Sequence, residues 1–413
     1  MQKNLIRAAI AVLIIAIIVA TAPYINGAIK GKYNDFPVAL QVMQLVKTRY
    51  IHPTSFVKLM DLYLKTGDIH KTLTILKDPY TRYLSPKQYQ DLRTETEGTF
   101  GGIGIYLDYT NNMLTVMRPI KGTPADRAGL LQGDKIMAVN GKPTKSLTLE
   151  QVISTIKGKI GTKVTITIER GTGDHAVKKN YRIVRSIIKM PTVDLQMRDD
   201  PVIGKVAYIV LTQFAETTPG DLENSLNAAE RQGAKGIILD LRYNPGGVLT
   251  SAVSVASKFL PGNGRVLRVV QRGYPPQDYP ALANPHPHLP LVVLVNEWSA
   301  SASEIVAGAL KDRKAGVLVG NKTFGKGVVQ DIIPLNNGGA LTLTVAAYLT
   351  AGGHYIHHIG IEPNVKITPP AEVTKEVKKG NFKPLQKFDK SLLDAAMKVL
   401  RQEILGVQEK KSA

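Results

Sequence analysis

The alternation of apolar and polar residues along the chain predicts where strands and helices follow one another. Residues 163–169 are apolar at every second position, which is typical of a strand with one buried face. After residue 205, continuous apolar runs such as 236–241 and 291–295 alternate with amphipathic stretches such as 249–259. This order predicts an α/β layer, in which ligands bind near the carboxyl ends of the strands.

The same pattern predicts helices on both sides of this region. Residues 35–97 carry apolar stripes at helical spacing, and an amphipathic helix is expected at 390–405 in the basic tail. Residues 275–290 are rich in proline and are expected to form a loop. The elements expected in the α/β layer are strands at 205–211, 236–241, 291–295, 317–319, 328–333 and 341–348, and helices at 221–232, 249–259 and 301–311.

Residues 98–186 have the pattern of a separate module. A glycine-rich turn at 101–104 is followed by a strand, a helix start at 123–126, a strand ending in an Asn-Gly turn, and a helix over 149–156. This order closely resembles a PDZ domain of the bacterial protease type. Such a domain holds a terminal carboxylate on backbone N–H groups and pairs an extended peptide with a strand edge. The residues expected to bind the peptide are Gly102, Ile103, Gly104, Ile105, Leu149, Val152 and Ile153.

The N-terminus predicts export. Lys3 and Arg7 precede an apolar run over residues 8–22, as in a secretory signal. The small residues Ala20 and Ala22 favour cleavage and Pro23 opposes it, so a cleaved signal peptide and an uncleaved anchor both stay open. We expect the protein in the periplasm or at the outer face of the cytoplasmic membrane.

Composition excludes some classes of function. The chain has no cysteine, which removes disulfides, thiolate metal sites and cysteine nucleophiles. The formal net charge is +20, which favours anionic lipid or cell-wall surfaces for an exported protein. No zinc-finger spacing, RNA-binding aromatic motif or dense Lys/Arg helix is found, so no nucleic acid partner is expected.

Candidate chemistry lies in two short segments, 296–304 and 323–330. Ser301 opens a predicted helix, where the Ala302 N–H would stabilise a developing anion, and the Gly246-Gly247 turn would supply a second N–H. Lys326 lies between two glycines, and desolvation would lower its pKa from about 10.4 so that it could act as a base. Gln330 would orient the lysine amine. From these segments alone, a helix cap at Ser301 and a surface Lys326 stay open.

Residues 35–405 resemble the carboxyl-terminal-processing peptidases. The matching segments stand in family order: DPYTRYL at 78–84, the PDZ motifs, DLRYNPGG at 240–247, NEWSASASEI at 296–305 and TFGKGVVQ at 323–330. The resemblance implies Ser301 as nucleophile, Lys326 as general base and Gln330 as its partner. It also implies an α/β fold with a crotonase-like (ClpP/crotonase-type) protease core, an inserted PDZ domain and helical N- and C-terminal parts.

Two segments depart from the family pattern. Thr350-Ala351-Gly352-Gly353 stands where the family has T-P-x-G, and Asn364 follows Pro363 where the family has Asp. Neither segment contains a dyad residue. His354, His357 and His358 cluster nearby without a spaced carboxylate partner, so no metal site is expected. No cofactor is expected either.

We therefore predict an exported serine endopeptidase that captures apolar C-terminal protein tails and cleaves them through an acyl-enzyme. The expected parts are a signal segment (1–27), a helical region (28–97), the PDZ domain (98–188), the protease core (189–370) and a basic helical tail (371–413). An adaptor or activator protein, association with the inner membrane and a homo-oligomer are left open. The rival hypotheses are a non-catalytic, membrane-anchored PDZ scaffold and a crotonase-like acyl-CoA enzyme.

Overall fold

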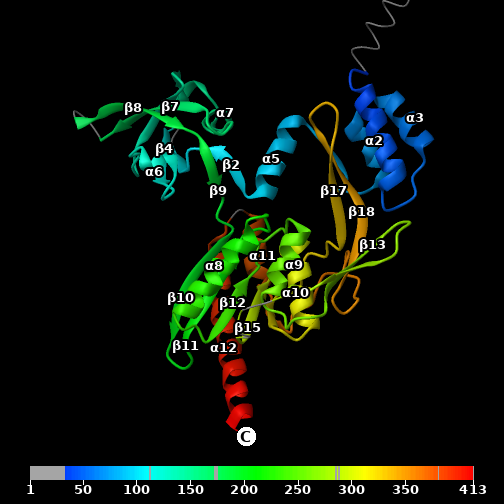
Figure 1. Cartoon of the computed structure of the whole chain (residues 1–413), viewed down its shortest axis with the longest axis vertical. Coiled ribbons are helices and arrows are strands. Elements are labelled where there is room, and N and C mark those ends of the chain that lie inside the picture. Colours follow the sequence, from blue (N-terminus) through cyan, green and yellow to red (C-terminus); the bar gives the residue numbers. More distant parts are fainter. Residues whose placement is uncertain are drawn as a thin grey trace, which may run out of the picture. The chain divides into compact units, whose positions relative to one another are not determined.

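The computed structural model describes residues 33–110, 113–171, 175–283, 286, 289–379 and 381–412 (Figure 1). The chain divides into two compact units. The first comprises the residues up to Asp91 with Arg268–Asp278 and Gly327–Leu349, and the second comprises the rest. The predicted signal segment lies outside the described residues. Within the part of the chain that the structure describes, no helix is long and apolar enough to cross a membrane.

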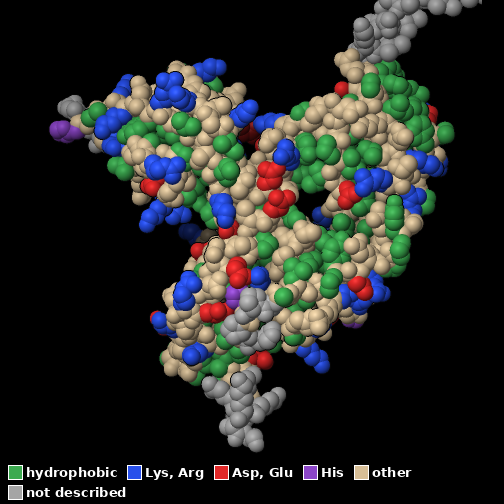
Figure 2. Space-filling model, in the orientation of Figure 1, with side chains coloured by type: hydrophobic (Ala, Val, Ile, Leu, Met, Phe, Trp, Pro, Cys, Tyr) green, Lys and Arg blue, Asp and Glu red, His purple; other side chains and the backbone are tan. Residues whose placement is uncertain are grey.

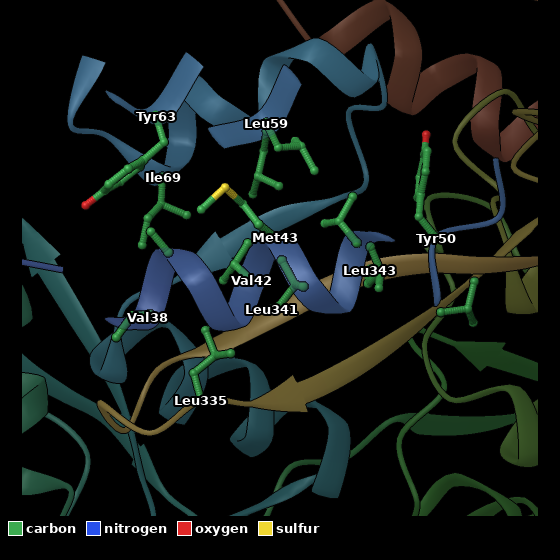
Figure 3. Close-up of a cluster of buried hydrophobic side chains, with 14 of the residues drawn as sticks. Val38, Val42, Met43, Tyr50, Leu59, Tyr63, Ile69, Leu335, Leu341 and Leu343 are labelled. Carbon is green, nitrogen blue, oxygen red and sulfur yellow. The ribbon is translucent and has the colours of Figure 1, made fainter. Parts of the chain in front are cut away.

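The first unit packs helices against a β-sheet. Its helices are α2 (Phe36–Arg49), α3 (Phe56–Thr66), α4 (Ile69–Leu73) and the 3₁₀ turn η1 (Thr74–Leu76), and α5 (Pro86–Glu97) leads out of it. The sheet has the order β1 (Arg82–Leu84), β18 (Ala340–Thr350), β13 (Arg265–Gln271) and β14 (Gln277–Pro280), and β17 (Val328–Pro334) also pairs with β18. Side chains of α2, α3, α4 and β18 meet in one buried cluster (Figure 3), whose labelled members include Val42, Met43, Leu59, Tyr63, Leu341 and Leu343.

The segment Asp78–Leu84 joins these helices to the sheet. The Asp78 carboxylate accepts hydrogen bonds from the Tyr80 N–H (2.9 Å) and the Thr81 hydroxyl (2.7 Å). The Thr81 hydroxyl in turn accepts a hydrogen bond from the Thr344 N–H of β18 (3.1 Å). The chain turns at residues 79–80, and the strand β1 that follows was not predicted, because three residues carry too little periodicity.

The PDZ region folds around one buried apolar cluster. Its sheet has the order β3 (Ile105–Thr110), β4 (Met113–Pro119), β5 (Lys135–Val139), β7 (Lys163–Arg170) and β8 (Val177–Val184), with β6 (Lys142–Pro143) pairing β5. The helices α6 (Pro124–Arg127) and α7 (Leu149–Ile156), with the 3₁₀ turn η2 (Thr144–Ser146), connect these strands. A separate ribbon of β2 (Thr99–Gly102) and β9 (Ser186–Lys189) joins the two ends of the domain. The module boundaries near residues 98 and 188 stay a prediction.

A buried ion pair stabilises the PDZ fold. The carboxylate of Asp134, whose side chain is 1% exposed, accepts hydrogen bonds from Arg170 (2.7 and 2.8 Å) and from the Leu131 N–H (2.8 Å). Burial alone would raise the pKa of Asp134, but the hydrogen bonds from Arg170 and Leu131 together with the charge of Arg170 lower it.

Replacing Arg170 with Ala is expected to destabilise the PDZ domain by about 3 kcal/mol at pH 7, because a buried carboxylate is left unpaired. Since the folded-state pKa of Asp134 is depressed, the stability contributed by the pair is present above the unfolded value of about 3.9 and is lost as pH falls through the folded value. Thermal unfolding of the full chain at pH 7 and at lower pH measures both effects. The matched control is Arg182→Ala on the exposed side of β8. An equal effect of the two variants at pH 7 would contradict the prediction.

The six-stranded sheet of the second unit has the order β10 (Val193–Asp200), β11 (Gly204–Leu211), β12 (Gly236–Asp240), β15 (Leu291–Val295), β16 (Val317–Gly320) and β19 (Val365–Lys366). All neighbours are parallel except β10 and β11. The helices are α8 (Thr218–Arg231), α9 (Leu249–Ser257), α10 (Ala302–Asp312), α11 (Ala371–Lys378) and α12 (Lys383–Ser412). The predicted α/β alternation is confirmed for the strands from β11 to β16. The strands predicted at 328–333 and 341–348 form β17 and β18 of the other sheet, because an apolar pattern shows that a strand forms but not which sheet it joins.

The two faces of this sheet carry different helices. Leu392, Ala396 and Leu400 of α12 pack against alternate strand residues such as Ile238 and Val292. The neighbouring residues Ile237 and Leu291 point to the other face, where they line a hollow with α8 and the end of α9. Residues 392–404 of α12 therefore form a layer against the sheet of the second unit (Figure 1). The proline-rich segment predicted as a loop contains the short strand β14.

Basic residues are spread over the surface seen in Figure 2, between acidic and hydrophobic side chains. They form no single stripe on that face. The pattern is that of a solvated basic surface.

Candidate active site

The candidate site lies at the carboxyl ends of β12 and β15. These parallel strands are neighbours, so the loops that follow them, 241–248 and 296–301, begin side by side. Four hydrogen bonds join the first loop to the second loop and to the start of α10. The Asn244 carbonyl accepts from the Ala300 N–H (3.1 Å) and from the Ser303 hydroxyl (2.9 Å). The Ser299 hydroxyl donates to the Leu241 carbonyl (2.8 Å), and the Tyr243 N–H donates to the Asn296 side chain (3.1 Å).

Ser301 occupies a strained backbone conformation at the start of α10. Its φ is 55° and its ψ is −113°, a combination that favours glycine. Such a conformation costs about 1–3 kcal/mol and persists only where the surrounding structure enforces it. The Glu304 N–H donates to the Ser301 carbonyl (2.8 Å) at this helix start. The strain is not explained by helix capping alone and favours a functional serine.

The glycine turn approaches Ser301 closely. A Cβ on Gly246 would lie 2.7–2.9 Å from the Ala300 carbonyl oxygen, the Ser301 Cβ and the Ala302 nitrogen. The φ values of Gly246 (104°) and Gly247 (143°) also lie in the region that favours glycine. Only glycine therefore fits against the serine at position 246.

One predicted oxyanion donor needs correction. The Gly246 N–H donates to the Asn244 side-chain oxygen (2.9 Å) in a buried hydrogen bond, so it is not directed at a substrate. The Gly247 and Ala302 N–H groups have no acceptor among the described residues. The donors that remain from the predicted set are Gly247 and Ala302. Gly246 is excluded because its N–H binds the Asn244 side chain, and the sequence does not show how that side chain is oriented.

Glu304 links the serine to the lysine loop. Its side chain is fully buried and accepts four hydrogen bonds. One carboxylate oxygen, Oε2, accepts from the Ser301 N–H (2.9 Å) and the Lys326 N–H (2.8 Å). The other, Oε1, accepts from the Thr323 hydroxyl (2.6 Å) and the Gly325 N–H (2.7 Å). Because one oxygen atom binds both backbone N–H groups, the nitrogens of Ser301 and Lys326 are less than about 6 Å apart.

The lysine loop is also fixed from its other side. The Gly325 carbonyl accepts from the His358 N–H (2.8 Å), and the Thr323 hydroxyl accepts from the Ile361 N–H (2.7 Å). A Cβ on Gly325 would lie 2.9 Å from the Gly360 nitrogen, so the two loops are in close backbone contact. Lys326 itself is half-buried and is held in a defined loop, which disfavours the interpretation as an ordinary surface lysine.

Gln330 lies on β17, in the first of the two units. Lys326 precedes that strand, which begins at Val328, so strand alternation does not by itself place the two side chains on one face. The Gln330 Nε2 atom is buried and has no hydrogen-bond partner among the described residues. A contact between Gln330 and the lysine amine stays a prediction.

A charged cluster beside the glycine turn was not recognised as part of the site. Arg242 donates to the Asp240 carboxylate (2.6 and 2.9 Å) and to the Asp389 carboxylate of α12 (3.0 Å). The Tyr208 hydroxyl donates to Asp240 (2.7 Å), and burial together with that carboxylate raises the pKa of Tyr208 to about 12. Burial likewise raises the pKa of Asp389. The sequence feature that could have indicated this charged cluster is the Asp-x-Arg spacing at the end of a buried strand.

The predicted PDZ residues lie in two settings. Ile103 and Val152 are buried in the domain core (1% and 2% exposed), so they support the pocket from inside. Ile105, Leu149 and Ile153 are only partly buried. The strand β3, which begins at Ile105, is paired on one side only, by β4. An extended peptide therefore has a strand edge with which to pair. Gly102 ends β2, and Gly104 has a φ of 80°.

The two segments that depart from the family pattern are explained locally. The Asn364 side chain accepts a hydrogen bond from the Leu318 N–H of β16 (2.9 Å), which an aspartate oxygen would accept equally. In the other segment, the Asp312 carboxylate accepts from the Thr350 hydroxyl and from the Gly352 N–H (2.7 Å). Both are structural features outside the candidate site.

The histidines outside the candidate site lie in different surroundings. His286, in the proline-rich segment, is buried and lies 2.7 Å from the Glu230 carboxylate and 3.0 Å from that of Glu223. His354 is largely exposed, 3.8 Å from Asp312, and the rings of His357 and His358 are in contact. Among the described residues, no group of three or more His, Asp or Glu is arranged to hold a metal ion.

Comparisons with known proteins agree with this geometry. Residues 205–367 match peptidase family S41, and residues 115–170 match the PDZ domain. The chain is 38% identical over 312 residues to carboxyl-terminal-processing peptidase 3, chloroplastic, of Arabidopsis thaliana, across 73% of this chain and 60% of that protein. It is 38% identical over 313 residues to the carboxyl-terminal-processing protease of Synechocystis sp., across 74% of this chain and 72% of that protein.

A solved structure is similar over most of its length. It is that of the photosystem II D1 C-terminal processing protease, with a TM-score of 0.50 and 29% sequence identity across 80% of this chain and 92% of that one. The α/β protease fold with a PDZ domain and helical ends is therefore confirmed. The chain belongs to peptidase family S41, among the carboxyl-terminal-processing serine peptidases.

Proposed function

We propose that this protein is an exported endopeptidase that binds protein C-termini through its PDZ domain and cleaves them with a Ser301–Lys326 dyad. The protease core is, in this proposal, of the crotonase-like type. The observation that carries the proposal is the buried Glu304 carboxylate, which holds the backbone N–H groups of both dyad residues on one oxygen atom. The strained backbone of Ser301 and the close approach of Gly246 support it.

The proposed reaction is acyl transfer in two stages. The neutral Lys326 amine takes the hydroxyl proton as Ser301 Oγ attacks the scissile carbonyl carbon. The N–H groups of Gly247 and Ala302 stabilise the resulting oxyanion. The C–N bond then breaks, and the Lys326 ammonium gives its proton to the leaving amine. A water molecule, deprotonated by Lys326, hydrolyses the ester on Ser301 and restores the hydroxyl. Gln330 would orient the amine throughout.

The proposed substrates are cell-envelope proteins with apolar C-terminal tails. The free edge of β3 and the partly buried side chains of Ile105, Leu149 and Ile153 support binding of an extended apolar tail. The N-terminal segment, with Lys3 and Arg7 before its apolar run, supports export to the periplasm or to the outer face of the cytoplasmic membrane. An adaptor or activator protein, inner-membrane association and self-association are compatible with this function.

Tail recognition is tested with three versions of one substrate protein that differ only at the C-terminus. We expect efficient cleavage of a substrate ending in Leu-Ala-Ala. KM should rise at least about tenfold, equivalent to about 1.4 kcal/mol, when the tail ends in Asp-Asp or when its terminal carboxylate is amidated. Steady-state cleavage of the three substrates is followed by mass spectrometry. Equal KM values for the three substrates would show that the protein cleaves them without recognising the C-terminus.

A further inference from the structure

We propose that Asp389, at the start of the C-terminal helix α12, is a positioning residue for the glycine turn of the active site. This inference rests on the proposed function and deepens it. It makes the C-terminal tail, which lies far from Ser301 in sequence, a part of the catalytic arrangement. The relevant residues all belong to the second unit.

Asp389 binds two consecutive residues of the loop after β12. Arg242 Nη1 donates both to the Asp389 carboxylate (3.0 Å) and to its backbone carbonyl (3.0 Å). The Tyr243 hydroxyl donates to the second carboxylate oxygen (2.8 Å). The Arg242 side chain is only 7% exposed, so water cannot readily replace the contacts that Asp389 supplies.

The contacts continue from this loop to the reacting groups. Tyr243 has a φ of 60°, which an ordinary side chain adopts only when its surroundings enforce it. The next residue, Asn244, is fully buried, and its side chain holds the Gly246 N–H while its carbonyl accepts from Ala300. Gly247, the proposed oxyanion donor, follows directly. A shift at Tyr243 would therefore change the direction of the Gly247 N–H.

The helix that carries Asp389 is a rigid support. One turn after Asp389, Leu392 and Leu393 begin an apolar stripe that packs against the sheet and continues through Ala396, Leu400 and Ile404. Further along, Arg401 binds the buried Asp200 carboxylate at the end of β10 (2.7 Å). The stripe and the Arg401 pair fix α12 to the sheet, whereas Asp389 contacts the active-site loop.

Because α12 contacts the sheet and the active-site loop through different residues, the two roles can be tested with separate variants. Asp389→Asn weakens the contact with the loop. Arg401→Gln removes a different ion pair of the same helix, and Asp394→Asn changes an exposed aspartate one turn away from Asp389. Tyr243→Phe removes only the hydroxyl that binds Asp389, from a side chain that is partly exposed, so it should fold normally. Ser301→Ala reports on the proposed function itself.

The experiment measures kcat, KM and melting temperature for cleavage of a protein with an apolar tail by the full chain. We expect kcat of Asp389→Asn to fall about 10- to 100-fold with KM nearly unchanged, since loss of a whole oxyanion donor costs about 10²–10³-fold. Tyr243→Phe should lose a few-fold in kcat. Arg401→Gln should melt earlier yet keep its kcat at temperatures where it is folded, and Asp394→Asn should match the wild type.

Two outcomes would overturn the inference. The first is wild-type kcat in both Asp389→Asn and Tyr243→Phe. The second is a loss of kcat in Asp389→Asn that only follows its folded fraction, as for Arg401→Gln. If Asp389→Asn does not fold, Tyr243→Phe decides the question, because an unchanged kcat there means that the contact does not position the loop. Tail cleavage by Ser301→Ala would instead reject the proposed dyad, and this result is distinguishable from both outcomes that concern Asp389.

Discussion

Lys326→Ala is expected to eliminate measurable tail cleavage while the affinity for tail peptides stays unchanged. Without the amine, no group in the proposed site takes the proton from Ser301 or returns it to the leaving nitrogen. Loss of one member of a nucleophile–base pair lowers kcat by about 10⁴–10⁶-fold. The backbone N–H of Lys326 still binds Glu304 in the variant, so the loop should keep its conformation. Cleavage is measured by mass spectrometry, and tail binding by fluorescence anisotropy.

Two further variants sharpen this prediction. Lys326→Arg keeps the positive charge but cannot lose it, so it should be as inactive as Lys326→Ala if the lysine acts as a base. Lys322→Ala removes a lysine of the same loop that pairs with the exposed Glu362 (3.3 Å), and it should retain activity. Cleavage by Lys326→Arg at more than a few per cent of the wild-type rate would contradict a general-base role.

Glu304→Gln is expected to reduce both stability and activity strongly. Each carboxylate oxygen accepts two hydrogen bonds, and an amide must place its NH₂ group against one pair of donors. Leaving two buried donors unsatisfied costs about 1–3 kcal/mol each, or about 2–6 kcal/mol in total. Because one pair contains the Ser301 and Lys326 N–H groups, we also expect kcat to fall at least about 10²-fold, as for misplaced catalytic groups.

Urea unfolding and steady-state cleavage together test this second prediction. The control is Glu297→Gln, an exposed glutamate in the loop before α10 that accepts a hydrogen bond from Asn321 (3.2 Å). It should differ little from the wild type in either measurement. If Glu304→Gln keeps wild-type kcat in the folded protein, the carboxylate serves the fold and does not align the dyad.

Much of this site could be predicted from the chain because its signals are local. The end of β15 and the start of α10 follow from an apolar run and a helix-forming segment around Ser301. The glycines at 246 and 247 indicated a close backbone approach, and Gly246 indeed lies against Ser301. The order of strands and helices in the PDZ region was also predictable, since turns and alternation mark each element.

What could not be predicted depends on contacts between distant residues. Glu304 matched a local capping box, but three of its four partners are Thr323, Gly325 and Lys326, about twenty residues away. The Gly246 N–H was predicted as an oxyanion donor because nothing in the pattern shows that Asn244 binds it. The tail showed an amphipathic helix, but periodicity cannot show that α12 covers the sheet or that Asp389 reaches Arg242.

The most direct test of the account is a comparison of the C-termini of exported proteins made with the wild-type enzyme and with Ser301→Ala. The C-termini are determined by mass spectrometry of intact envelope proteins from cells that differ only in which of the two enzymes they make. We predict that a subset of proteins keeps its apolar C-terminal tail only in the Ser301→Ala cells, and that the purified wild-type enzyme shortens the same proteins. Identical C-termini in the two cell types, or cleavage by the purified Ser301→Ala protein, would contradict the proposed role of Ser301.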